Sequence, residues 1–114
     1  MTAAEQQFRA LPKERITFAT DAGSVVVDAV VCRSKMVVES ATGAILQVQS
    51  HDYIVRASDL IIASVVVTPL KGNTVSRVFA GLTYTYQLMI PTFDLHDHAG
   101  LFLRLHSKLI STTQ

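Results

Sequence analysis

The stretch Leu82-Thr83-Tyr84-Thr85-Tyr86-Gln87-Leu88-Met89-Ile90 has the clearest period of two in the chain. Successive side chains of an extended strand point to opposite faces, so residues two apart share a face. One face of this stretch carries large apolar and aromatic side chains, those of Leu82, Tyr84, Tyr86, Leu88 and Ile90. The pattern predicts a strand that buries this face in a core.

Turn signals and short apolar runs continue on both sides of this stretch. Downstream, we expect a loop over residues 91–100 and a last strand over residues 101–106. Upstream, Ala80-Gly81 and the segment 69–73 are turn signals that bound a strand over residues 74–79. Further strands are expected over residues 16–19, 24–32, 45–49, 53–56 and 60–68, the last of them buried on both faces. Residues 33–44 read as a long connection or hairpin tip, and His51-Asp52 reads as a turn.

The order of these segments predicts an all-β fold. About seven short strands, with turns every eight to twelve residues, are typical of a small antiparallel β-sandwich or barrel. The strands do not alternate with long helices, which argues against a parallel α/β sheet. We expect the β domain to span residues 16–110, followed by a loose tail over residues 111–114.

The N-terminal segment, residues 1–15, differs from the rest because its period is helical. Thr2 and Glu5 fit a capping box, and Phe8 and Leu11 recur at helical spacing before Pro12. A helix of about ten residues is marginal in water on its own. The segment is therefore expected to be a short helix or a flexible arm that orders when Phe8 and Leu11 find a surface.

The composition restricts the class of protein. The chain has 114 residues, of which 49% are hydrophobic and only 17% charged, and a net charge of +1. So few charges predict either a generous core or a surface that a partner partly covers. The net charge lacks the basic excess of nucleic-acid-binding domains. Cys32 is the only cysteine, which excludes an intrachain disulfide. The longest apolar run, residues 60–67, is too short for a membrane-spanning helix of about 20 residues.

No group of residues resembles a catalytic or cofactor site. His96 and His98 lie two apart and could share a metal, but a structural zinc site needs four ligands and no second cluster exists. A solvated loop is therefore the favoured interpretation of the two histidines. Cys32 lies in a valine-rich strand without an evident base, where a cysteine behaves as a small hydrophobe. We predict no enzyme activity and no cofactor.

Two alternatives from other functional classes remain open at this stage. Tyr84 and Tyr86 on one strand face could stack bases, as in small barrels that bind single-stranded nucleic acid. Basic residues do not accompany them, so packing in the core is favoured. A metal-dependent hydrolase around His96 and His98 is the other alternative, and it predicts bound metal.

A series of turn motifs follows Asp59 in a fixed order. It reads Asp59-Leu60, Pro69-Leu70-Lys71-Gly72-Asn73, Gly81-Leu82-Thr83-Tyr84, Asp97-His98-Ala99-Gly100 and Leu101-Phe102-Leu103-Arg104-Leu105. In this order and spacing the chain resembles the head–tail joining, or neck, proteins of long-tailed phages, including the lambda type. The resemblance covers about half of the chain. It leaves head-completion stopper, adaptor, tail terminator and minor tail protein as alternatives.

The resemblance implies a structural protein of the virion neck, made in the host cytoplasm. Such proteins form a ring, a hexamer or a dodecamer, with the portal or adaptor ring above and a tail terminator or tail protein below. They help retain packaged DNA in the channel without sequence specificity, and they act neither as enzymes nor at a membrane.

Two surfaces are candidates for assembly contacts. The first is the apolar side of the N-terminal helix, where Phe8 and Leu11 are expected to meet a neighbouring ring. The second is the polar segment 33–43, which contains an apolar island and is expected to contact the ring above or project toward the channel. Its candidate residues are Arg33, Lys35, Met36, Val37, Val38 and Glu39.

Overall fold

The strand predicted over residues 82–90 is the first part of a longer strand, β7 (Leu82–Leu95). The computed structural model describes residues 3–39, 43, 45–95 and 101–114. Its other elements are α1 (Ala3–Ala10), β1 (Glu14–Thr20), β2 (Gly23–Glu39), β3 (Ile45–Arg56), the 3-10 helix η1 (Ala57–Asp59), β4 (Ile61–Ile62), β5 (Val65–Val66), β6 (Thr74–Phe79) and β8 (Phe102–Thr113). The all-β class is thus confirmed.

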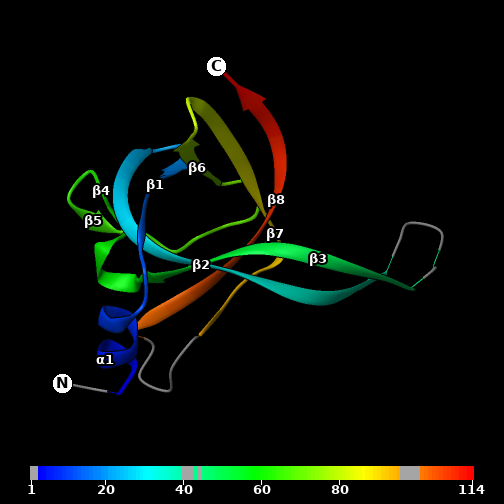
Figure 1. Ribbon diagram of the computed structural model, residues 1–114, viewed down its shortest axis with the longest axis horizontal. Coiled ribbons are helices and arrows are strands. Elements are labelled where there is room, and N and C mark those ends of the chain that lie inside the picture. Colours follow the sequence, from blue (N-terminus) through cyan, green and yellow to red (C-terminus); the bar gives the residue numbers. More distant parts are fainter. Residues whose placement is uncertain (1–2, 40–42, 44, 96–100) are drawn as a thin grey trace.

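Six strands close into an antiparallel barrel in the order β1-β2-β3-β8-β7-β6, with β6 returning to β1 (Figure 1). Of the two architectures predicted, the barrel is therefore the one observed. The strands β4 and β5 form a separate two-stranded hairpin beside it. Closure gives most strands a partner on both edges and so removes most of the exposed backbone polar groups of an open sheet.

The barrel interior contains the faces that the period of two predicts. On β2, Val27 and Ala29 are buried, with Val25 and Val31 packed against the same core. The remaining strands contribute the buried side chains of Ile16, Phe18, Tyr53, Val55, Val75, Tyr86, Leu88, Leu103 and Leu105. Branched aliphatic and aromatic side chains suit such a pleated, buried surface. One hydrophobic core therefore lies inside the barrel.

The segment 60–68 is not the buried strand that we predicted. Leu60 and Ile62 are buried, but the chain reverses at Ala63 and Ser64, which have φ of 53° and 66°. Two consecutive left-handed residues form the kind of tight turn that joins the strands of a hairpin. As a result Val65 and Val66 return over the outside, with exposed fractions of 61% and 58%.

Four other predictions, two for loops, one for a turn and one for the tail, fail over the described residues because strand pairing continues through them. Residues 33–39 and His51-Asp52 are paired in the β2–β3 hairpin. Residues 91–95 belong to β7, where a register shift between Leu88 and Phe93 accommodates Pro91 in a bulge. Residues 111–113 of the predicted tail belong to β8 and pair with residues 83–85, because β7 offers them a backbone edge. The division into segments 1–15 and 16–110 stays a prediction.

One α-helix, α1, lies in the described part of the chain, against the outside of the barrel (Figure 1). No helix in that part is long and apolar enough to cross a membrane. The hairpin of β2 and β3 projects away from the barrel on another side (Figure 1). These two features give the molecule its extents of 46 × 36 × 28 Å.

Candidate assembly surfaces

The helix α1 is attached to the barrel wall through Phe8. This side chain is 6% exposed and packs with Val30, Ile54 and Phe102 in a second hydrophobic cluster, outside the barrel. The rings of Phe8 and Phe102 lie 4.9 Å apart at 37°, and the guanidinium of Arg56 lies 5.5 Å from the Phe8 ring. Aromatic pairs and cation–π contacts of this kind add to the stabilisation from buried area. Phe8 therefore has a partner within its own chain.

The end of α1 is stabilised by Lys13. Its ammonium donates hydrogen bonds to the carbonyl oxygens of Phe8, Arg9 and Leu11, at 2.8, 3.2 and 3.0 Å. Carbonyl groups at the C-terminus of a helix lack intrahelical partners, and a cation there also interacts favourably with the helix dipole. Leu11 itself remains 38% exposed. A contact of Phe8 or Leu11 with a neighbouring ring stays a prediction.

The second predicted surface lies on a two-stranded hairpin extension, which we define as residues 33–39 of β2 and 45–51 of β3. Seven residue pairs join the two strands, from Arg33↔His51 to Glu39↔Ile45. The barrel neighbours end at the base of this region. β1 pairs with β2 only as far as Ala29, and β8 pairs with β3 only as far as His51, the last residue of the extension. The structure describes the backbone of residues 33–39, and the contacts of their side chains lie outside what it describes.

A group of polar and charged side chains around the buried Asp52 lies at the root of the extension, on the outer wall of the barrel. Asp52 is fully buried and accepts hydrogen bonds from the hydroxyl of Ser50 and from Nε of Arg104, the latter at 2.7 Å. The imidazole of His106 lies between two carboxylates, with Nδ1 3.1 Å from Asp52 and Nε2 2.8 Å from Asp94. A buried carboxylate is tolerated only with partners of this kind. We call these five residues the root cluster.

The root cluster joins three strands where one of them leaves the barrel. Asp52 comes from β3, Arg104 and His106 from β8, and Asp94 from β7. Pairing places Asp52 directly opposite His106 on one side and Cys32 on the other. Burial raises the pKa of the Cys32 thiol, an effect that Arg104 opposes and Asp52 reinforces. The cluster therefore fixes the start of the extension relative to the barrel.

The sequence alone does not predict this cluster, although it contains a signal for it. Arg104 and His106 alternate with leucines in the last strand, and this period of two puts them on the face opposite Leu103 and Leu105. Asp52 was assigned to a turn, and nothing in one sequence pairs residues that lie 52 and 54 positions apart. The interaction follows from the β3–β8 register, which only the closed barrel sets.

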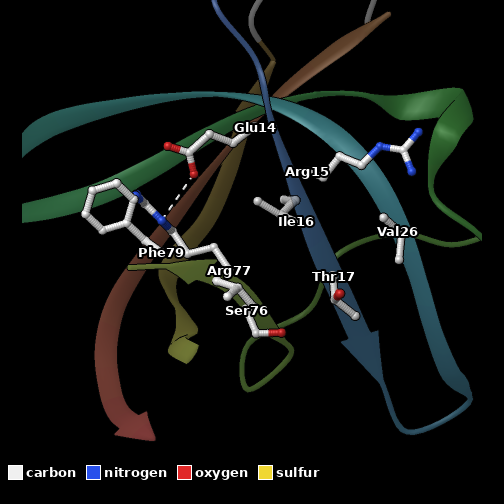
Figure 2. A pocket seen from close by; sticks show the side chains of 9 residues that line it. Glu14, Arg15, Ile16, Thr17, Val26, Ser76, Arg77 and Phe79 are labelled. Carbon is white, nitrogen blue, oxygen red and sulfur yellow. Dashed lines mark ion pairs between the residues drawn. The ribbon is translucent and has the colours of Figure 1, made fainter. Parts of the chain in front are cut away.

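A groove opens on the barrel surface where β1 and β6 separate. It has a volume of about 540 Å³ and lies between residues 14–17 of β1 and 76–79 of β6, with Val26 beside them. Figure 2 shows the Arg77 side chain reaching across to Glu14, and the Arg77 Nε–Glu14 Oε2 distance is 3.1 Å. We call this the β1–β6 groove. Its lining combines charged and apolar side chains, without the convergent buried polar groups of an active site.

The tyrosines that could have stacked bases are engaged with the core. Tyr86 is 8% exposed and stacks on His51, with ring centroids 4.4 Å apart. Tyr53 meets Tyr86 edge-on at 5.7 Å, and Tyr84 is half-buried against the same core. Burial raises the pKa of the Tyr53 phenol strongly, with Arg77 among the groups that oppose the shift. A free aromatic platform is therefore missing from the described face of β7.

The histidines considered as metal ligands, His96 and His98, lie outside the described residues. In the described ranges, no group of three or more histidine, cysteine, aspartate or glutamate side chains is placed to hold a metal ion. The root cluster brings two carboxylates and one imidazole together, but the imidazole and the guanidinium of Arg104 already occupy them. The arrangement suits a structural contact between strands.

Comparison with known proteins identifies the family to which the chain belongs. A family model described as phage head–tail joining protein matches residues 1–114, the whole sequence. No curated protein matches it. The match extends the resemblance from the turn motifs after Asp59 to the N-terminal half, including α1 and the hairpin extension. The chain therefore belongs to the phage head–tail joining protein family, whose members are structural, non-enzymatic components of the virion neck.

Proposed function

We propose that this protein forms a ring between the portal or adaptor ring and the tail of a long-tailed phage. In that position it completes the filled head, helps retain the packaged DNA and provides the surface to which the tail attaches. Its partners are further copies of itself, in a hexamer or dodecamer, the portal or adaptor above and a tail terminator or tail protein below. The hairpin extension is the observation that carries the proposal.

The extension has the length and the rigid attachment that an inter-ring contact needs. Seven paired residues on each strand, at about 3.3 Å per residue, reach roughly 20 Å beyond the barrel. The root cluster ties its base to β7 and β8, so the direction of the extension is fixed before assembly. Such preorganisation reduces the entropic cost of binding. The extension is thus suited to reach an adjacent ring or the central channel.

The role of the extension is testable with charges at its apolar island. We expect a Met36→Asp, Val38→Asp double variant to fold normally but to fail in joining heads to tails, because two carboxylates cannot be desolvated in an apolar contact. The measurement is complementation of a phage that lacks the protein, scored by infectious titre and by free heads and tails in micrographs.

The matched control places the same substitutions on another exposed hairpin. Val65→Asp, Val66→Asp changes two exposed valines of β5 and should leave joining intact. Normal joining by the Met36→Asp, Val38→Asp variant would refute a role of the extension in assembly.

Electron microscopy of purified particles tests the position of the protein. We expect its density as a ring directly below the portal or adaptor ring. A ring at the distal side of the tail joint would instead favour a tail terminator. Complete particles without this protein at the neck would overturn the proposal.

A further inference from the structure

Closure of the barrel leaves some strand edges without a partner, and most of these edges carry features that discourage further pairing. Natural proteins protect a free edge with charged residues, with proline or by keeping the strand very short. Charged residues lie on the free edges of β1, β2 and β6, which are residues 14–16, 30–39 and 77–79. The free edge of β7, residues 89–95, contains Pro91 and Asp94, and β4 and β5 are only two residues long.

Two edges in the described part of the chain lack this protection. They are residues 45–50 of β3 and 109–113 of β8, which we call the β3 edge and the β8 edge, and neither contains a charged residue or a proline. Both lie beyond the pair His51↔Ser107, at which the pairing of β3 with β8 ends. Each strand has a partner on its other side, β2 for β3 and β7 for β8. Each edge can therefore accept one further strand.

The β8 edge also exposes apolar side chains, since Leu109 and Ile110 are 51% and 48% exposed. A bulge at Ile110 bends the strand at one position, because Tyr86 pairs with Leu109 and Thr85 with Ser111. Beyond the bulge, residues 111–113 pair with β7 in regular register. An uncharged edge with exposed apolar side chains is a template for pairing with another chain.

The two unprotected edges match each other but diverge within one chain. Beyond His51↔Ser107, β3 continues into the hairpin extension, whereas β8 continues to the C-terminus in another direction (Figure 1). The two edges are similar in length, and pairing between them desolvates no charged residue of either edge. The β2 edge of the extension contains Arg33, Lys35 and Glu39, and burial of such charges is costly unless each finds a partner. A second copy of the chain therefore supplies the strand that suits each unprotected edge.

We propose that the β3 edge of one copy pairs with the β8 edge of a neighbouring copy. The contact deepens the ring proposed above and rests on it. The two strands run antiparallel, as β3 and β8 do within the chain, so the ladder that ends at His51↔Ser107 is resumed between copies. Because the two edges lie at different places on one chain, the contact is heterologous. Repetition of a heterologous contact gives a ring when the rotation closes.

Cysteine crosslinking in assembled particles tests this contact. Cys32 is first replaced by serine, since it is partly accessible. Ser111→Cys is then combined with Gln47→Cys or with Val48→Cys, because adjacent strand residues face opposite sides and one of the two shares the face of residue 111. Cysteines on neighbouring strands lie within the Cα distance of about 6 Å that a disulfide needs. Thr113→Cys replaces Ser111→Cys if the latter impairs folding.

We expect mild oxidation to produce dimers, trimers and larger species from one of the two double-cysteine variants. A mixture of the corresponding single variants should give dimers, and each single variant alone should stay monomeric on denaturing gels. Val37→Cys combined with Ser111→Cys is the matched control and should stay monomeric. Val37 pairs with Gln47 across the extension, so it lies equally far along the hairpin but on the charged edge.

Four results would overturn the contact. Dimers of one single variant alone would show that an edge pairs with its own copy in the neighbour, and a disulfide within one chain would show that the edges meet there. Crosslinking of the control alone would assign the contact to the β2 edge.

Failure of every combination, in particles whose neck ring is visible by electron microscopy, would exclude pairing of the two edges while leaving the proposed function in place. Absence of the protein from the neck would instead defeat the proposed function, so the two failures are distinguishable.

Discussion

Asp52 is the residue whose environment differs most from what its type would suggest. It is fully buried on the outer wall of the barrel and interacts with Ser50, Arg104 and His106. Burial alone would lower the pKa of Arg104, but its hydrogen bond to Asp52 and nearby negative groups raise it instead. Each charge in the root cluster is therefore stabilised by the others, and loss of one removes part of the stabilisation of its partners.

Removal of the Asp52 charge should destabilise the protein. We expect Asp52→Asn to lower the free energy of unfolding by about 3 kcal/mol, because breaking a buried ion pair leaves uncompensated charges. Urea unfolding followed by circular dichroism measures the change. The matched control is Asp28→Asn, which removes an exposed pair with Arg15 at 3.7 Å and should cost less than about 1 kcal/mol. Equal effects of the two substitutions would contradict the role assigned to the root cluster.

Cys32 gives a second prediction for a single residue, based on pH. Because burial raises its pKa, less thiolate exists at a given pH in the folded chain than in the unfolded chain. Alkylation by iodoacetamide should be slower in native buffer than in urea, and its pH midpoint should lie higher. The same shift makes stability fall as the pH rises above the pKa of the unfolded thiol. Equal midpoints in the two states would contradict the shift.

Among the elements, α1 shows how a marginal helix becomes ordered. Its eight residues are too few to be stable alone. Phe8 supplies the tertiary contact with Phe102 and Arg56, and Lys13 stabilises the last turn. The sequence predicted the helix and the need for a surface, but it did not reveal that the chain's own barrel provides one.

Truncation of Phe8 should release the helix from the barrel. We expect Phe8→Ala to lower the free energy of unfolding by about 3 kcal/mol, the usual loss for a buried phenylalanine, and to abolish amide protection in α1. Hydrogen exchange with mass spectrometry measures the protection. Leu11→Ala, at a side chain that is 38% exposed, should change stability by about 0.5 kcal/mol or less. Unchanged protection of α1 in Phe8→Ala would exclude Phe8 as its anchor.

At the scale of the whole molecule, the net charge determines how strongly the protein attracts a charged partner such as DNA. A net charge of +1 offers little attraction to the phosphates of DNA. Retention of packaged DNA would then depend on the shape of a closed ring rather than on affinity. The low share of charged residues, 17%, agrees with the proposed assembly, in which partners cover exposed apolar surface.

The free protein should therefore not bind nucleic acid. We expect no saturable change in the fluorescence anisotropy of labelled single-stranded or double-stranded DNA at low salt. Binding that weakened steeply with salt and was lost in Tyr84→Ala would favour the nucleic-acid-binding alternative instead.

The sequence by itself determined the all-β class, the inward face of β7, the helix around Phe8 and the resemblance to neck proteins. Each of these depends on residues that lie close together in the chain. The period of two of a strand, the period of 3.6 of a helix and the residues that favour turns can all be recognised in a short stretch of sequence. The order of turn motifs alone indicated the family that the full-length match establishes.

Only the tertiary structure decided the features that depend on distant residues. The register of β3 with β8 brings Asp52 to Arg104 and His106, which are 52 and 54 positions away. The same register ends at His51↔Ser107, so the paired strands beyond it become an extension and not a loop. Backbone pairing depends little on side-chain type, and closure of the barrel fixes where each pairing stops. Local sequence therefore does not determine which strands pair or where the pairing ends, because both depend on the complete sheet.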